Sequence, residues 1–190
     1  MFVKSPTGNI NPIKESNDLE RTEINYGREV DRVAQNMGYE PSYFKALIVL
    51  ECSGRKKFKP RFENHVFEKL KKVRDKKKHN YNGITHAMIH DASDDALRNL
   101  ATSWGPFQLM GYQVIPLDLN IADIRGKDAI YWGMQWIKKR YGKRLKKEQY
   151  KDCFHIHNTG RPYPAFGGPR THDPKYVDKG LKYMTYFQEN

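Results

Sequence analysis

The segment PSYFKALIVLECSG, residues 41–54, is almost continuously apolar over ten positions. Pro41 stands where the first turn of a helix tolerates proline, and Gly54 follows as a helix stop. A helix that is apolar on every side has to be buried. We therefore predict a central helix that the rest of the chain surrounds, with Glu51 at its carboxyl end.

Helical patterns also occupy most of the remaining chain. Apolar residues recur at helical spacing from Ser16 to a stop at Gly38. The segment around Phe62 is ambiguous between strand and loop, and residues 79–95 and 158–173 read as loops. Further helices are predicted over 94–103, 106–114, 123–141 and 146–157, and from an N-cap at Asp173 through Tyr186. The prediction is a mainly α, single-domain fold over residues 16–190, after an irregular N-terminal arm over residues 1–15.

Composition favours a folded chain with an anionic partner. A length of 190 residues suits one domain, and the formal charge of +12 with a pI near 9.6 suits a polyanion. The basic run at 69–78 is predicted to be a solvated helix face, with an anion-binding surface as the alternative. Cys52 and Cys153 form no disulfide framework, so we expect two free buried thiols rather than a pair that forms after export.

No secretory or membrane segment is apparent in the sequence. The first residues, MFVKSPTGNINPIKESN, contain no apolar signal core, and no apolar run approaches the ~20 residues that span a bilayer. We expect synthesis in a reducing cytoplasm, so that another component would have to deliver the protein to any external substrate.

Three short motifs carry candidate chemistry. A carboxylic acid that is partly withdrawn from water, as expected for Glu51, can donate a proton near neutral pH. A Gly-x-x-Gln turn follows in SWGPFQLMG, residues 103–111, and an asparagine ends an apolar helix in HIHNTG, residues 155–160. Taken alone, each motif is explained by ordinary packing or capping, although both of the later segments can also present polar groups to a sugar.

Taken in order, the motifs resemble the lytic transglycosylase and goose-type lysozyme superfamily of peptidoglycan glycosidases. That family has a Glu-Ser pair, a Gly-Leu-Met-Gln segment and an Ala-Tyr-Asn segment, matched here by residues 51–52, 105–108 and 156–158. The segment FENHVFEKL, residues 62–70, resembles the phage N-acetylmuramidase branch. The resemblance covers roughly residues 40–187 and leaves the N-terminal arm and first helix unmatched.

The resemblance implies a lysozyme-like fold with a substrate cleft and cleavage of the β-1,4 bond between N-acetylmuramic acid and N-acetylglucosamine. Glu51 would be the acid, and in a transglycosylase it would then deprotonate the muramic acid 6-hydroxyl. Gln108 and Asn158 would hold the sugar and Phe107 would form an apolar wall, with Ser103 and Gly105 in the same substrate-binding set. No cofactor or metal is implied.

The implied protein is a monomer, and its partners would be peptidoglycan strands and anionic cell-wall polymers, with no specific nucleic acid. A phage endolysin, a virion-associated lysin or a secreted effector would each fit, with delivery through a holin, a virion or a secretion system.

The chain departs from the family pattern at three positions. Cys52 replaces the serine, Phe107 replaces the methionine, and His157 replaces the tyrosine that hydrogen-bonds the acid in the family. A neutral His157 could hold Glu51, a protonated one would favour the carboxylate form of Glu51, and the ring could instead point elsewhere.

A hydrolase of the usual kind needs a second carboxylate, roughly 5–5.5 Å from the first for retention or 6.5–9.5 Å for inversion. Glu63 is the favoured candidate because it lies in the muramidase-like segment, although a structural role is equally consistent. Asp91, Asp94 and Asp95 are the other candidates. The sequence leaves hydrolase and transglycosylase open.

Two other functions compete with this one. His86 and His90 would share a helix face next to Asp91, and His155 adds an imidazole, as in a zinc peptidase or amidase. Ala87, however, stands where the metalloprotease signature needs glutamate. The basic runs at 69–78 and 137–147 would suit a nucleic-acid-binding protein, but no base-reading motif accompanies them.

Overall fold

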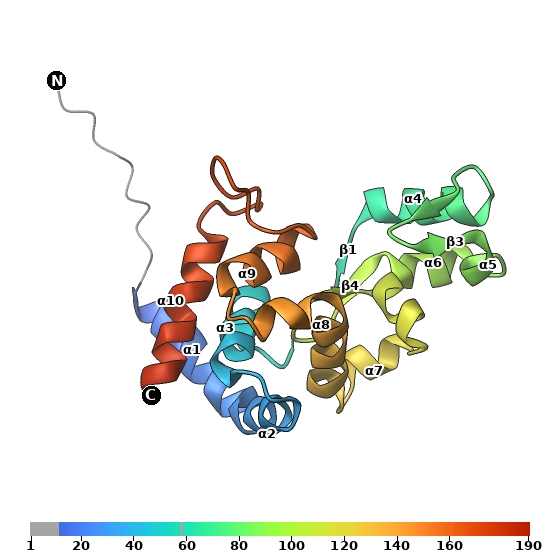
Figure 1. The fold of residues 1–190 in the computed structure, drawn as a ribbon. Coiled ribbons are helices and arrows are strands. Elements are labelled where there is room, and N and C mark those ends of the chain that lie inside the picture. The colour runs from blue at the N-terminus through green and yellow to red at the C-terminus, as the bar shows by residue number, and fades with distance from the viewer. Residues whose placement is uncertain (1–11, 58) are drawn as a thin grey trace.

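A computed structural model describes residues 12–57 and 59–190, and these are mainly helical (Figure 1). The helices are α1 (Pro12–Thr22), a π-helix (Glu23–Gly27), α2 (Arg28–Met37), α3 (Pro41–Cys52), α4 (Asn64–Arg74), α5 (His86–Ile89), α6 (Asp94–Leu100), a 3₁₀-helix (Gly111–Leu117), α7 (Ile121–Arg125), α8 (Ala129–Leu145), α9 (Tyr150–Thr159) and α10 (Tyr176–Glu189). The strands are β1 (Arg61–Phe62), β2 (Asn80–Tyr81), β3 (Ile84–Thr85), β4 (Thr102–Trp104) and β5 (Leu109–Met110). They pair antiparallel in the orders β1-β4-β5 and β2-β3. The predicted mainly α class is confirmed.

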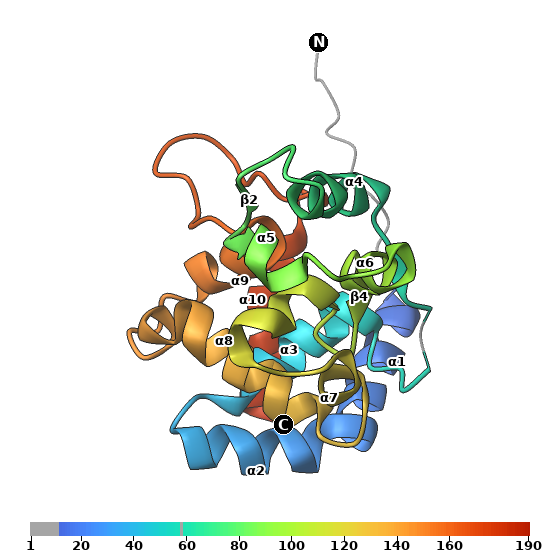
Figure 2. The same ribbon diagram turned by 90° about the vertical axis from the view of Figure 1, so that its right-hand side faces the viewer.

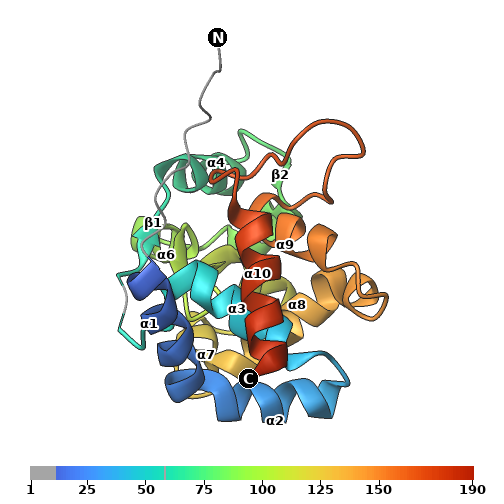
Figure 3. The same ribbon diagram turned by 90° about the vertical axis from the view of Figure 1, so that its left-hand side faces the viewer.

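Helix α3 is the buried centre of the fold, as its sequence predicts. Every residue from Ser42 to Val49 is buried, while α1 and α10 pack against α3 (Figure 3). The Glu40 side chain accepts a hydrogen bond from the Ser42 backbone and caps the start of the helix. Ser53, in the left-handed region at φ 54°, ends it immediately after Glu51 and Cys52.

The apolar residues form two cores, which divide the described chain into two lobes. The large core surrounds α3 and includes residues of α2, α8, α9 and α10. The small lobe, residues 61–101, has its own core together with Tyr112 from the 3₁₀-helix, and Figure 2 views the molecule from that side. The buried residues of the small core are Val66, Phe67, Leu70, Val73, Ile84, Ile89, Leu97, Ala101 and Tyr112.

The prediction of a helix over 106–114 was wrong. The chain forms a β-hairpin from β4 and β5, with Gly105–Gln108 as its turn, and then the 3₁₀-helix. The backbone N–H of Gln108 donates to the Gly105 carbonyl at 3.1 Å, which closes the turn. Gly105 and Gln108 both have positive φ values, 73° and 48°, which an α-helix excludes.

The last four residues of the predicted irregular arm, 12–15, are helical instead. Residues 1–11 lie outside the described residues, but the backbone of residues 12–15 belongs to α1. Helix α1 runs through the π-helix into α2 and ends at Gly38, which confirms the predicted stop. Lys45 of α3 is buried, and its ammonium group pairs with Glu23 and Asp31 at 2.9 Å each, which ties α3 to this helical segment.

Helix boundaries in the C-terminal half also differ from prediction. The segment 123–141 is two helices, α7 and α8, which residues 126–128 separate. Helix α9 starts at Tyr150 rather than at 146. Asp173 does not cap α10, because its carboxylate accepts from the Lys175 backbone at 2.9 Å in a turn before the helix begins at Tyr176. Apolar spacing and capping residues thus predicted where these helices lie but not the residues at which they begin.

Both cysteines are free and buried, as predicted. Burial raises the pKa of the Cys52 and Cys153 thiols to about 12 each, so both stay protonated and unreactive near neutral pH. None of the helices described above is both long enough and apolar enough to cross a bilayer.

Candidate active site around Glu51

Glu51 is held by a tyrosine from the other end of the chain. It lies in the last turn of α3, partly buried, and its Oε1 accepts a hydrogen bond from the hydroxyl of Tyr176. Tyr176 is buried at the first position of α10, and burial together with the Glu51 charge raises its phenol pKa well above the usual value. Among the described residues, Tyr176 is the one hydrogen-bond partner of Glu51. Tyr176 therefore fixes one carboxyl oxygen and leaves Oε2 without a protein partner there.

The ring of His157 is hydrogen-bonded to the hairpin turn and to α8 rather than to Glu51. Its Nε2 lies 3.0 Å from the Phe107 carbonyl oxygen and its Nδ1 lies 2.8 Å from the hydroxyl of Tyr141. A carbonyl oxygen can only accept, so Nε2 carries the proton and Nδ1 accepts from Tyr141. Tyr43 donates in turn to the Tyr141 hydroxyl at 3.1 Å, which completes a buried chain of three groups.

Burial lowers the pKa of His157, and the nearby Glu51 charge and the Phe107 carbonyl oppose this only in part. The ring is therefore neutral at pH 7. Of the three roles considered for His157, the structure supports the last, in which the ring points elsewhere, although Glu51 still acts on it through space. Tyr141 reaches His157 because α8 is interrupted there, with φ −146° and ψ 22°.

The side chain of Gln108 is bonded within its own hairpin. Its Oε1 accepts from the Ser103 hydroxyl at 2.9 Å, and its Nε2 donates to the Gly105 carbonyl at 3.0 Å. Ser103 and Gly105 are both buried, and a Cβ on Gly105 would collide with the Ile124 carbonyl oxygen. Ser103 and Gly105 thus shape the turn, and half-buried Gln108 keeps its second amide N–H and the second lone pair of Oε1 for a ligand.

The predicted role of the Phe107 ring as an apolar wall was wrong. The ring is 1% exposed and packs edge-on against Phe44 of α3, with centroids 6.4 Å apart. It also fills the space above Gly133 of α8, where a Cβ would collide with the ring. The Phe107 ring therefore belongs to the core, while its backbone carbonyl accepts a hydrogen bond from His157.

Asn158 and Glu63 lie in different surroundings. Asn158 is exposed in the last turn of α9, directly after His157. Glu63 precedes α4 in the small lobe, where its carboxylate pairs with Arg61 at 2.7 Å and approaches His65 at 3.6 Å. These contacts fit the structural alternative for Glu63, and its role as a second carboxylate stays a prediction. Among the other candidates for a second carboxylate, Asp94 pairs with Lys71 and Arg74, and Asp91 and Asp95 are exposed.

The turn after Glu51 is clamped by the first helical segment. Side chains from this segment donate to three consecutive carbonyls: Arg21 to Ser53 at 2.9 Å, Asn25 to Gly54 at 2.8 Å, and Tyr26 to Arg55 at 2.8 Å. The π-helix contributes two of these donors. The first helical segment therefore positions the turn that ends the helix carrying Glu51.

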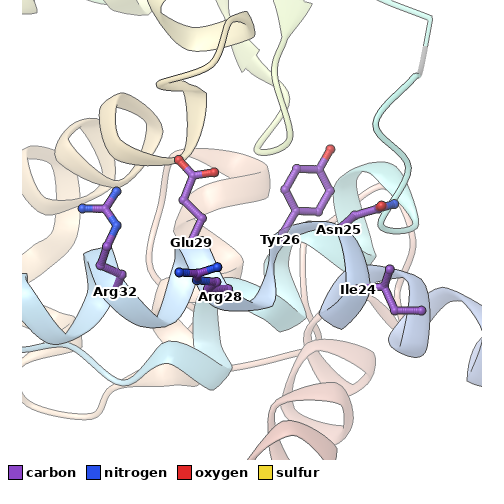
Figure 4. Close-up of a pocket in the computed structure, with 6 residues that line it drawn as sticks. All are labelled: Ile24, Asn25, Tyr26, Arg28, Glu29 and Arg32. Atoms are coloured by element: carbon purple, nitrogen blue, oxygen red, sulfur yellow. The ribbon is translucent and has the colours of Figure 1, made fainter.

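A pocket of about 530 Å³ adjoins this clamp. Figure 4 shows Tyr26, Glu29 and Arg32 pointing to the same side of the helix, with Asn25 turned toward the loop after α3. Burial raises the pKa of the Glu29 carboxyl, which Arg32 partly opposes. Ile24 and Arg28 complete the lining. The pocket therefore combines one carboxyl group and two guanidinium groups with the ring of Tyr26.

The histidines considered as metal ligands are occupied by backbone groups. His86 bonds the Arg74 carbonyl at 2.7 Å, and His90 bonds the Ala87 carbonyl at 3.2 Å. His155 bonds the Arg161 carbonyl at 2.7 Å. Across residues 12–57 and 59–190, no three side chains of the metal-binding types gather into a group that could hold an ion.

Comparison of the chain with family models, curated proteins and solved structures gave no match. Function must therefore be inferred from the sequence and from the arrangement of these residues.

Proposed function

We propose that the protein is a peptidoglycan glycosidase with a lysozyme-like fold, and that Glu51 is its acid catalyst. The observation that carries the proposal is the Tyr176–Glu51 hydrogen bond at the end of a buried helix. A carboxyl group in this position is partly withdrawn from water and has a fixed orientation. Both properties suit a group that gives its proton to one particular oxygen.

The two oxygens of Glu51 have different roles in this proposal. Oε1 accepts from Tyr176, so Oε2 is the atom that carries the proton to the glycosidic oxygen. When the bond between the sugars breaks, the leaving sugar keeps that proton and Glu51 becomes a carboxylate. The Tyr176 hydroxyl stabilises this negative charge by a charge-assisted hydrogen bond.

The carboxylate then acts as a base in either of two reactions. It can take a proton from water, which gives a hydrolysed reducing end, or from the muramic acid 6-hydroxyl, which closes an anhydro ring. In both cases Glu51 regains the proton it gave up, so the cycle balances. Glu63 forms an ion pair with Arg61 in the small lobe, and the products decide between the two reactions.

Tyr176 would take the part that the family resemblance gives to a tyrosine at position 157. In this chain, position 157 is a histidine that is bonded to Phe107 and Tyr141. The hydroxyl that orients the acid comes instead from α10. Asn158 is exposed beside this arrangement and would contact the sugar, while the +12 charge would favour anionic cell-wall polymers.

The test is lysis of purified peptidoglycan by the full chain and by Glu51→Gln. Losing a general acid typically reduces the rate by about 10²–10⁴-fold, and we expect a loss of that size with an unchanged circular dichroism spectrum. Glu68→Gln is the matched control, because Glu68 is an exposed glutamate on α4, and it should retain full activity. Full activity in Glu51→Gln would remove Glu51 from its role. Mass spectrometry of the products would show anhydro ends for a transglycosylase and reducing ends for a hydrolase.

A further inference from the structure

A second pocket, of about 750 Å³, lies in the loop between α9 and α10. This loop projects beyond the helices in Figures 1 and 3. It begins directly after Asn158 and Thr159 and ends at Tyr176, so it joins two parts of the proposed active site. The pocket is lined by His155, Thr159, Arg161, Pro162, Pro164, Ala165, Phe166 and Arg170.

The pocket is organised by one buried histidine. His155 is 1% exposed, and its Nδ1 donates to the Arg161 carbonyl at 2.7 Å, while its Nε2 accepts from the Arg170 backbone N–H at 3.0 Å. The two arginines, nine positions apart, are thus tied by their backbones to opposite sides of one ring. Tyr163 adds a further anchor, since its N–H donates to Asp152 at 3.1 Å and its ring packs edge-on against His155. The pocket is therefore shaped before a ligand arrives.

Its lining combines unneutralised cations with an exposed aromatic ring. Arg161 and Arg170 are exposed, and neither guanidinium has an ion pair within the described residues. Phe166 is 93% exposed at the tip of the loop, with Pro162 and Pro164 nearby. Guanidinium groups match carboxylates in geometry, and an aromatic ring and prolines match small apolar side chains. A short peptide that carries carboxylates presents both kinds of group.

We infer that this pocket binds a short carboxylate-bearing peptide. The identity of the peptide rests on the proposed function. It is the peptide attached to the lactyl group of muramic acid in uncross-linked or partly cross-linked peptidoglycan. Because the loop that carries the pocket connects Asn158 to Tyr176 in the chain, a bound peptide would bring its own muramic acid toward Glu51. The enzyme would then cut peptide-bearing strands faster than strands from which the peptides have been removed.

Direct binding tests the pocket independently of catalysis. Calorimetry with the full-length Glu51→Gln chain would use a synthetic acetylated stem pentapeptide and the same peptide with its carboxylates amidated. We expect the free acid to bind and the amide to bind about tenfold more weakly, as for loss of one charge-assisted hydrogen bond. In R161Q/R170Q the free acid should also bind about tenfold more weakly. These variants keep the loop, because His155 bonds the backbones of the two arginines and not their side chains.

The matched control is R28Q/R32Q, which removes two exposed arginines from the other pocket and leaves peptide affinity unchanged. Absence of binding to the wild-type pocket at millimolar peptide, equal affinity for acid and amide, or an equal loss in both double variants would each overturn the inference. Phe166→Ala should weaken binding of the free acid by a further few-fold, since stacking on the exposed ring would be lost.

Cleavage then separates this inference from the proposed function. The chain with native Glu51 should cut peptide-bearing strands about tenfold faster than stripped strands, and R161Q/R170Q should lose that preference while cutting stripped strands at the wild-type rate. Activity on both substrates with no preference would overturn the peptide site and leave the glycosidase standing. Peptide binding with no cleavage of either substrate would support the pocket and overturn the glycosidase.

Discussion

Removal of the Tyr176 hydroxyl is the sharpest test of how Glu51 is held. In Tyr176→Phe the ring stays in the core, and the only lost group is the donor to Glu51 Oε1. Hydrogen bonds to charged groups contribute about 1.5–3 kcal/mol, and this one strengthens when Glu51 becomes a carboxylate after giving up its proton. At 1.36 kcal/mol per tenfold in rate, that range corresponds to a kcat lower by about 10–150-fold.

The loss should appear in kcat while KM stays nearly constant, because Tyr176 is buried and bonds Glu51 rather than a sugar. The assay is initial-rate cleavage of soluble glycan strands, with unfolding in urea measured on the same samples. Tyr131→Phe, which removes a hydroxyl from the exposed face of α8, is the control and should change neither quantity. An unchanged kcat in a folded Tyr176→Phe would refute the reasoning, and so would a loss confined to KM.

Three further predictions concern stability. Burial lowers the pKa of His157 below its value of about 6.5 in the unfolded chain, so the unfolded chain binds more protons as pH falls. The contribution of His157 to the free energy of unfolding is therefore complete above about pH 6.5 and declines below it. Urea unfolding measured from pH 8 to 5 should show a weaker decline in His157→Gln than in the wild type. Gly54→Ala places a Cβ 2.6 Å from the Thr22 backbone nitrogen at φ 66° and should lower the free energy of unfolding in urea by more than about 2 kcal/mol. Gly83→Ala has the same kind of backbone strain, at φ 86°, but open space around the new Cβ, and should lower it by about 1 kcal/mol. Phe107→Ala should cost about 3–5 kcal/mol of unfolding free energy, which a surface wall residue would not.

The sequence predicts elements that are decided by local patterns. The apolar run of α3 and its ends at Pro41 and Ser53 follow from burial and capping, which a few neighbouring residues determine. The hairpin at 102–110 was not predicted, because a short apolar run such as this one is compatible with a buried helix as well as with two strands. What decides between them is the positive φ at Gly105 and Gln108, and glutamine gives no sign of that conformation.

The candidate site shows the same limit more strongly. The motifs led to the proposal of Glu51, His157 and Asn158 as site residues. The hydrogen-bond partners of Glu51 and His157, however, include tyrosines that lie elsewhere in the sequence. Tyr176 is 125 residues from Glu51, and Tyr141 reaches His157 only because α8 is interrupted. The sequence does place Tyr176 just after a proline and aspartate turn, but one tyrosine among twelve carries no signal of this contact.

The two ends of the described chain meet at the proposed catalytic residue. Tyr176 from α10 fixes the carboxyl group, and donors from α1 and the π-helix fix the turn that follows it. Helix α3 can therefore shift or rotate only if both sets of bonds yield together. These donors come from outside the three sequence motifs, while within the motifs the Cys52 carbonyl accepts from the Arg55 backbone N–H at 3.0 Å. The N-terminal helices therefore pack directly onto the end of α3, and their donors hold the turn that follows Glu51 while Tyr176 holds its carboxyl group.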